Sequence, residues 1–275
     1  LFGIRADMQF GKLKLQTVVS QKKSTSKNVS SKGGTQPTAF EISAADYEEN
    51  RHFFLSRYFR DNYDKAMSTL PNLVTGVEVN RVEIWVTNKT GTTSNTRNII
   101  ALTDLGENTK VHYKDWQLTG QPVPCNAANT EYQTLVNQYS EARDIDKAST
   151  VLAGIKDFEG GVDYEKLASA RLLSSSEYAV NTALGYVSLK TGLQTDQVLA
   201  IAYEFTYGGQ TYQVGEFASD NTQTGQALFV KSLKNTSNNP TQGNWDLMMK
   251  NVYYLASQVE KTKFRLDIKY QSDTA

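Results

Sequence analysis

Residues 3–21 read GIRADMQFGKLKLQTVVSQ, a pattern that leaves the backbone few alternatives. Apolar and polar residues alternate on both sides of Gly11, and a period of two is typical of a β-strand. Glycine at the first position of a two-residue loop suits a type II′ turn. A loop at Gly11 and Lys12 predicts these opposite pairs on one face of an antiparallel hairpin: Phe10 and Leu13, Met8 and Leu15, Ala6 and Thr17, Ile4 and Val19.

The second face of this predicted hairpin is polar, with Val18 as its exception. It pairs Gln9 with Lys14, Asp7 with Gln16 and Arg5 with Val18. Such a hairpin fits a soluble sheet with one buried face, and it also fits a membrane sheet whose apolar face meets lipid. The alternation alone leaves both environments open.

The charge balance argues against partners that are recruited by net charge. The 275 residues carry 29 basic and 29 acidic side chains, so no global field favours nucleic acid or an acidic partner. No apolar run approaches the ~18 residues of a transmembrane helix. Cys125 is the single cysteine, which excludes an intrachain disulfide. The chain starts at Leu1 without a signal-peptide pattern, so we expect a fragment of a longer polypeptide.

A polar segment follows the hairpin. Residues 20–38, SQKKSTSKNVSSKGGTQPT, are rich in Ser, Lys and Gly, which is typical of a solvated surface loop. Binding of nucleic acid or anionic lipid is the less favoured alternative for this stretch, because interleaved aromatic residues are absent from it. We therefore expect no nucleic-acid partner.

Helical signals occur in four places. Ser43 and Asp46 form a possible capping box ahead of a helix that runs toward Pro71, with a break near Asp61 and Asn62. Three more helices are predicted from apolar spacing or from a capping aspartate: residues 132–142, residues from Asp163 to 173, and residues 245–255.

Strand signals alternate with these helices. Residues 77–87 and 97–105 are predicted strands that we expect to pair with each other. Residues 198–207 and 210–217 flank Gly208 and Gly209, which predicts a hairpin with Phe205 opposite Tyr212 and Tyr203 opposite Val214. The alternating KFRLDIKYQ at 263–271 predicts a last strand. The predicted fold class is α+β, with antiparallel β hairpins and several helices.

Three short strings match the motif set of serine β-lactamases and penicillin-binding enzymes. They are S-x-x-K at Ser20–Lys23 and Ser24–Lys27, S-D-N at Ser219–Asn221, and K-T-G starting at Lys89 and at Lys190. In that family the nucleophile opens a buried helix, whereas both S-x-x-K candidates lie in a strand end or a flexible loop. The K-T-G strings also precede S-D-N, the reverse of the family order. Chance matches explain them best.

Other chemistry-bearing residues are equally unsupported. Neither His52 nor His112 has a second His or Cys at metal-ligand spacing. Charged helix faces explain the carboxylate pairs Glu48–Glu49 and Asp61/Asp64, and Cys125 has no basic neighbour to lower its pKa. The aromatic FFLSRYF at 53–59 fits core packing better than a docking face. We expect no enzyme, and no catalytic, cofactor-binding or metal-binding residue.

Several longer strings together resemble one protein family. They are DYEENRHFFLSRYFRDNYD (46–64), RVEIWVTN with RNIIALTDLGE (81–107), FEGGVDYEKLASARLL (158–173), EYAVNTALGYVSL (177–189) and YQVGEF (212–217). They resemble the SprA family, called Sov in some bacteria: giant outer-membrane proteins of the type IX secretion system, which exports cell-surface proteins and supports gliding. The resemblance spans nearly the whole chain.

The resemblance implies a fragment of a very large outer-membrane β-barrel that is mostly surface-exposed. Residues 1–23 would supply barrel strands, residues 24–262 an extracellular, cap-like α+β domain, and residues 263–275 a returning strand. Implied partners are other type IX secretion components, exported cargo proteins and outer-membrane lipid at the terminal strands; no cofactor is implied. The alternative is a wholly soluble α+β interaction module without barrel strands. A serine hydrolase or glycosidase that uses Ser24, His52 and Glu48 is the least favoured hypothesis.

Overall fold

A computed structural model describes residues 2–10, 13–21, 40–109, 111–118, 120, 123–221, 223–237, 239–257, 259 and 264–270. They belong to two units: residues 1–42 with 255–275, and residues 43–254. Residues 2–21 are described by their backbone alone, apart from Gly11 and Lys12, which lie outside the described residues. Of the surface loop predicted at residues 20–38, residues 22–38 lie outside them as well, whereas Ser20 and Gln21 belong to the second strand of the hairpin.

The first unit contains the predicted hairpin. Strand β1 (Phe2–Phe10) pairs antiparallel with β2 (Leu13–Gln21). The register joins Ile4 to Val19, Ala6 to Thr17, Met8 to Leu15 and Phe10 to Leu13, which confirms the predicted pairs. The type of the turn stays a prediction, because its two residues are not described.

The second unit holds the remaining elements. Its helices are α1 (Arg57–Met67), α2 (Glu131–Gln138) and α3 (Ala148–Leu152), with the 3₁₀ helices η1 (Lys114–Trp116), η2 (Ser140–Arg143) and η3 (Gly243–Leu247). Its strands are β3 (His52–Phe54), β4 (Val77–Val86), β5 (Thr96–Leu102), β6 (Tyr164–Leu172), β7 (Tyr178–Asn181), β8 (Tyr186–Leu189), β9 (Leu199–Tyr207), β10 (Gln210–Val214) and β11 (Leu228–Lys234).

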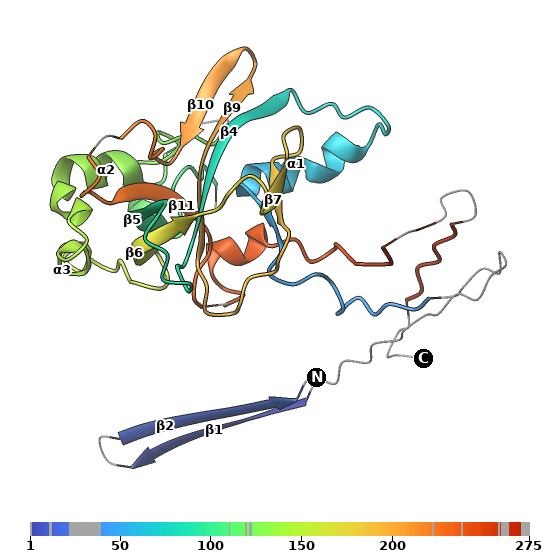
Figure 1. Cartoon of the computed structure of the whole chain (residues 1–275), viewed down its shortest axis with the longest axis horizontal. Helices are drawn as coiled ribbons and strands as arrows, with labels where there is room; N and C mark the ends of the chain where they lie inside the picture. Colours follow the sequence, from blue (N-terminus) through green and yellow to red (C-terminus); the bar gives the residue numbers. More distant parts are fainter. Residues whose placement is uncertain are drawn as a thin grey trace. The chain divides into compact units, whose positions relative to one another are not determined.

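A small closed barrel is the centre of this unit (Figure 1). The sheet order is β10-β9-β11-β5-β6-β4, and β4 pairs back onto β9, so five strands form a ring and β10 extends it as a hairpin arm. β11 and β5 run parallel, and the other neighbours are antiparallel. A second sheet, β3-β8-β7, is not part of the hydrogen-bonded ring.

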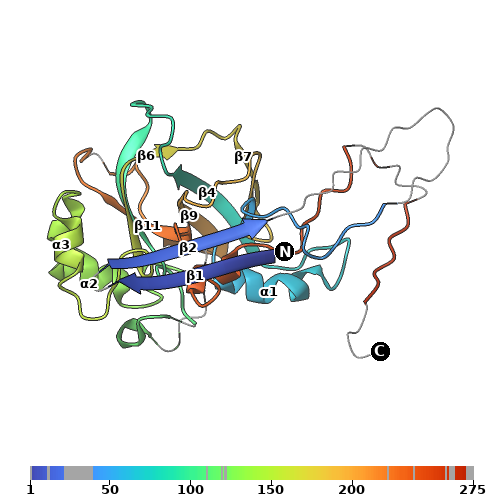
Figure 2. The ribbon, with the colours of Figure 1, turned by 90° about the horizontal axis from the view of Figure 1, so that it is seen from below.

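Two hydrophobic clusters lie on opposite faces of the barrel strands. Alternate strand residues such as Ala200 and Ala202 join Trp85 in the smaller cluster, which fills the narrow barrel interior with many small side chains. The strand residues that alternate with these, such as Ile201 and Tyr203, point to the other face and belong to the larger cluster outside the ring. Helices cover that outer face (Figure 2).

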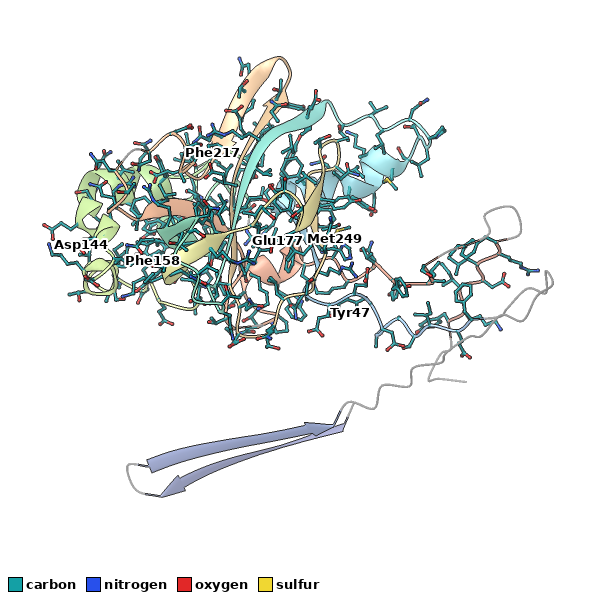
Figure 3. All side chains as sticks on the ribbon, in the orientation of Figure 1. Tyr47, Asp144, Phe158, Glu177, Phe217 and Met249 are labelled. Carbon is teal, nitrogen blue, oxygen red and sulfur yellow. The ribbon has the colours of Figure 1, made fainter. Side chains whose placement is uncertain are left out.

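The outer cluster extends around the barrel rather than to one side of it. The labelled Phe158 lies beside α3, and Met249 lies across the strands from it (Figure 3). Both side chains are buried members of the same cluster. The protein is therefore mostly β, with a few short helices that pack on the outside of a barrel.

The hairpin predicted at Gly208 and Gly209 is present. β9 and β10 pair antiparallel, with Phe205 opposite Tyr212 and Tyr203 opposite Val214. Both glycines have positive φ, 58° and 78°. A two-residue hairpin turn of type I′ requires positive φ at both of its central residues.

The predicted pairing of residues 77–87 with 97–105 is wrong, although both segments are strands. β6 lies between β4 and β5 and pairs with each of them. Sequence neighbours often pair, but here β6, the next strand along the chain, inserts between β4 and β5.

The helix predicted after Asp163 is also wrong, because this segment is strand β6. Its buried residues are Tyr164, Leu167 and Ala170, three positions apart, which imitates helical spacing. A β-bulge puts Leu167 and Ala170 on one face: the register against β5 shifts between Arg97 and Ile99, and Ser169 has φ 52°. Tyr164 is buried on the opposite face, in the larger cluster.

Two other predicted helices are shorter than expected. Ser43 and Asp46 do exchange hydrogen bonds, but they close a turn, and the helix begins only at Arg57, after strand β3. Helix α1 then runs unbroken through Asp61 and Asn62, so the predicted break is wrong.

The predicted helix at 245–255 is a 3₁₀ turn, η3, followed by extended chain. Met248 forms a bridge with Phe53, and the Met249 N–H donates to the His52 carbonyl. Backbone pairing with β3 therefore takes the hydrogen bonds that a helix would use. The residues predicted as helical at 132–142 do form α2 and η2.

Residues 264–270 lie in no strand within the described part of the chain. A strand needs a neighbour for its backbone hydrogen bonds, so the returning strand stays a prediction about the longer protein. Among the described residues, no helix has the length and apolar character to span a membrane.

Candidate functional site

The densest concentration of buried charge lies beside the barrel, where the loop after β5 meets two helices. Glu107 is fully buried, and its carboxylate accepts hydrogen bonds from the Arg57 N–H at 3.3 Å to each oxygen. The same carboxylate pairs with the Lys231 ammonium at 2.9 Å, and Lys231 is also fully buried. Glu107 therefore caps the start of α1 with a negative charge and joins it to β11.

Arg57 is the second buried cation of this group. Its guanidinium donates to the carbonyls of Thr109 at 3.0 Å and Gly243 at 3.2 Å, and it lies 3.9 Å from the Asp104 carboxylate. A Cβ atom on Gly243 would lie 1.8 Å from the guanidinium, so the close approach requires glycine at that position. Arg57 thus joins α1 to the loop after β5 and to η3.

Asp104 fixes the far side of the same loop. One carboxylate oxygen accepts from the His112 N–H at 2.7 Å and the Tyr113 N–H at 3.1 Å. The side-chain amide of Asn129 donates to the carbonyls of Asp104 at 2.8 Å and Glu107 at 3.0 Å. Asn129 in turn accepts from the Glu131 N–H, which sets the first turn of α2.

Glu131 completes the group, which we call the buried ionic cluster: Arg57, Asp104, Glu107, Glu131 and Lys231. Glu131 is fully buried, and neither of its carboxylate oxygens has a hydrogen-bond partner. Burial, reinforced by the charge of Asp104, raises the pKa of Glu131 well above its usual range. Burial also raises the pKa of Asp104, and the cations Lys231 and Arg57 oppose that shift.

This arrangement connects α1 and α2 to the barrel, which favours a structural role over a catalytic one. Apart from Glu131, each charged group of the cluster contacts a backbone group or an opposite charge, as structural clusters require. Among the described residues, no group of three or more His, Cys, Asp or Glu side chains has the arrangement of a metal site.

Two candidates from the sequence do come together. The His52 ring contacts the Ser188 hydroxyl through Nδ1 at 2.7 Å and the Glu48 carboxylate through Nε2 at 3.0 Å. Ser188 lies directly opposite His52 in the β3–β8 pair, so a cross-strand contact explains this chain of hydrogen bonds. Arg51 also pairs with Glu48.

The geometry of this trio differs from that of a hydrolase site. Ser188 lies within a strand that is paired on both sides, so the adjacent backbone N–H groups serve the sheet rather than an oxyanion. A structural role explains the contacts among Glu48, His52 and Ser188.

The remaining motif residues are scattered. Ser20 lies in β2, whereas Lys23, Ser24 and Lys27 lie outside the described residues. In the S-D-N string, Asp220 pairs with Arg81 and Ser219 donates to Glu83. The two K-T-G lysines are exposed at separate places: Lys89 pairs with Asp196, whereas Lys190 has a backbone bond to Glu177.

The other candidates have ordinary surroundings. His112 contacts the buried Asp163 carboxylate at 2.7 Å. Glu49, Asp61 and Asp64 are exposed. Burial raises the pKa of the Cys125 thiol, which makes it less reactive rather than more.

The ends of the second unit lie side by side. The Tyr253 hydroxyl donates to the Ala44 carbonyl at 3.0 Å, and the Glu48 N–H donates to the Val252 carbonyl at 2.8 Å. The unit therefore begins and ends at one place, as inserted domains commonly do. Within the first unit, the rings of Phe40 and Phe264 stack with centroids 6.0 Å apart.

Reasoning from the sequence missed the buried ionic cluster. Lys231 interrupts the apolar run LFVKSL, and Asp104 and Glu107 follow a strand that ends at Leu102. A lysine in a buried strand needs a buried partner, and this signal could have identified Lys231 but not its partner.

One comparison with known proteins gives a match. A family model named SprA_N, described as motility related/secretion protein, matches residues 1–204. No curated protein matches the chain. The matched segment includes the hairpin, α1 and the first strands of the barrel, and it ends inside β9.

Proposed function

The chain belongs to the SprA_N family of motility related/secretion proteins, and from this premise we propose that it is a segment of the outer-membrane translocon of the type IX secretion system. In this proposal β1 and β2 are barrel strands that contact lipid, and residues 43–254 are a surface-exposed domain with a cap or partner-binding role. The segment serves protein export and gliding without catalysing a reaction.

The hairpin supports the membrane part of the proposal. Each strand has nine residues, close to the ~9–11 that a tilted membrane strand needs. The register keeps Ile4, Ala6, Met8 and Phe10 on one face with Val19, Thr17, Leu15 and Leu13. A two-stranded hairpin alone is only marginally stable in water, so it needs neighbouring strands. A larger barrel would supply them.

The adjacent ends of residues 43–254 carry the domain part of the proposal. A domain whose ends meet at Ala44 and Tyr253 can be inserted between two neighbouring strands without separating them. Bacterial barrels place short turns at the periplasm and long loops outside. The tight turn at residues 11–12 would then be periplasmic and the inserted domain extracellular.

The segment at 264–270 fits the strand that follows such an insertion. Phe264, Leu266, Ile268 and Tyr270 alternate with charged residues, and Ile268 and Tyr270 are 90% and 91% exposed. Exposed apolar residues at every second position are expected of a strand that lacks its neighbours. Other secretion components and cargo proteins are the partners that we propose for the domain.

Spin labels in the full-length protein test the lipid contact. In a Cys125→Ser background, Met8→Cys and Leu15→Cys place labels on the apolar face, and Gln9→Cys and Lys14→Cys are matched controls on the other face. We expect oxygen, which concentrates in lipid, to relax the first pair, and a water-soluble nickel chelate to relax the controls. If oxygen relaxes the labels at positions 8 and 15 no more than the controls, the apolar face does not contact lipid, and the interaction-module alternative replaces this proposal.

Deleting residues 43–254 from the full-length protein tests the role of the domain. Because the ends of this unit meet, a short Gly-Ser linker can replace it, and the barrel should still assemble. We expect loss of cargo secretion and gliding with normal outer-membrane levels of the protein. Unchanged secretion would exclude a cap or partner-binding role.

The non-catalytic part of the proposal has its own test. Ser188→Ala removes the hydroxyl beside His52, and we expect normal secretion and gliding from this variant. A loss of secretion with an unchanged protein level would favour an enzymatic role for the trio.

A further inference from the structure

Among the described residues, Glu131 is the carboxylate with both oxygens buried and without a hydrogen-bond partner. It is 0% exposed, and both of its carboxylate oxygens lack a hydrogen-bond donor. An ionised carboxylate in such a place loses its hydration and gains nothing in return. Glu107 nearby is satisfied, because it binds Lys231 and the start of α1. One oxygen of Asp104 accepts two backbone N–H groups.

The surrounding charges leave no cation for Glu131. The groups that act on it are Asp104 in the loop after β5, Lys231 on β11, and Asp163 ahead of β6. Lys231 is paired with Glu107, Arg57 is the cation nearest Asp104, and Asp163 contacts His112. An ionised Glu131 would therefore add a negative charge to a group whose cations are already matched.

A neighbouring acceptor also lacks a donor. The Asp104 oxygen that faces Arg57 at 3.9 Å makes no hydrogen bond. Asp104 is also the charged group with the largest effect on Glu131. Two buried anions with unpaired oxygens that repel each other are unfavourable, and a proton on Glu131 removes one of the two charges.

We propose that Glu131 is a buried proton-binding site, which keeps its carboxyl group protonated in the folded protein at neutral pH. The proton brings the buried ionic cluster into charge balance and allows the first turn of α2 to pack against the barrel. The ligand of this site is the proton alone.

The proposal has a defined pH dependence. In the unfolded chain Glu131 loses its proton above about pH 4.3, the usual glutamate value, whereas burial raises the pKa of the folded form well above that. Between these two values the folded state binds the extra proton, so this group makes stability fall as the pH rises. A carboxylate with a lowered folded pKa acts in the opposite direction, as Glu177 does, whose pKa is lowered by the Ser174 N–H and by Arg171.

Side-chain carboxyl ¹³C NMR of the 275-residue chain tests the site directly. We expect one glutamate resonance at the position of a protonated carboxyl at pH 7, and we expect it to vanish in Glu131→Gln. A Glu131 resonance at the carboxylate position at pH 7 would overturn the proposal and would indicate a bound water or cation instead.

Thermal unfolding of two matched variants gives a second test. Glu131→Gln keeps the shape of the side chain and removes the titration, so we expect a higher Tm than wild type at pH 8 and a smaller dependence of Tm on pH between 5 and 8. Glu107→Gln is the control, since it leaves Lys231 buried without a counter-charge, and we expect a lower Tm at both pH values. If Glu131→Gln lowers Tm as Glu107→Gln does, the Glu131 carboxylate is ionised and the proposal fails.

Discussion

At the scale of single residues, the charges around Lys231 determine how well the helices hold to the barrel. Lys231→Met keeps the length of the side chain but leaves Glu107 as a buried, unpaired anion. We predict a loss of about 3–5 kcal/mol of unfolding free energy, the usual result of breaking a buried ion pair from one side. Urea denaturation followed by circular dichroism measures it.

A double variant separates the pair from the packing. Lys231→Met with Glu107→Gln removes both charges, and we expect it to regain more than half of the stability that the single lysine variant loses. Equal losses in the single and double variants would show that packing, not charge, accounts for the effect.

Both the backbone conformation and the lack of space for a side chain favour glycine at position 185. Its φ is 64°, and a Cβ there would lie 2.2 Å from the ring of Phe59. We predict that Gly185→Ala costs about 2–4 kcal/mol, since an overfilled core adds to the backbone strain. Gly91 is the matched control: its φ is 65° with open space around it, so Gly91→Ala should cost about 1–2 kcal/mol from strain alone. Equal losses from denaturant unfolding would exclude the contact with Phe59.

At the scale of elements, the sequence predicted what depends on near neighbours. The hairpins at residues 11–12 and 208–209 have the predicted registers, because alternation and turn residues lie within a short stretch of chain. Residues 46–56 and 245–255 were predicted as helical, yet His52–Phe54 and Met248 are extended, because each segment hydrogen-bonds to the other. A pairing partner so far along the chain leaves no local signal.

The β-bulge in β6 gives a prediction of its own. Ser169 has φ 52°, a conformation that costs a non-glycine residue about 1–2 kcal/mol. Its N–H donates to Asn98, and glycine would keep that bond. We predict that Ser169→Gly stabilises the protein by up to about 1 kcal/mol, after the entropy cost of glycine in the unfolded chain. Destabilisation in urea unfolding would mean that the hydroxyl has a role that the backbone does not explain.

The buried ionic cluster could not be predicted from the spacing of residues within single elements. Lys231 and Glu107 are separated by much of the chain and meet only because β11 lies parallel to β5. Strand order is a property of the complete barrel, so the partners of a buried charge follow from topology rather than from spacing.

At the scale of the whole molecule, the closed barrel sets the boundaries of the folding unit. The family match ends at residue 204, inside β9, whereas the ring also needs β11. We predict that a fragment of residues 43–254 folds cooperatively and that a fragment of residues 43–204 does not. Hydrogen exchange of β4 and β5 amides distinguishes them: strong protection in the shorter fragment would show that β11 is dispensable.

The order of the strands in the ring also limits when the protein can fold. Val77 in β4 pairs with Tyr207 in β9, and Ile99 in β5 pairs with Leu228 in β11. Neither pair can form before its later residue has been synthesised. Contacts between such distant residues form slowly, because the intervening chain must first be brought into a loop. A chain that emerges from the ribosome from its N-terminus therefore cannot close the barrel until Lys234 has appeared. Until then the strands already made lack their barrel neighbours, and their backbone groups remain hydrogen-bonded to water.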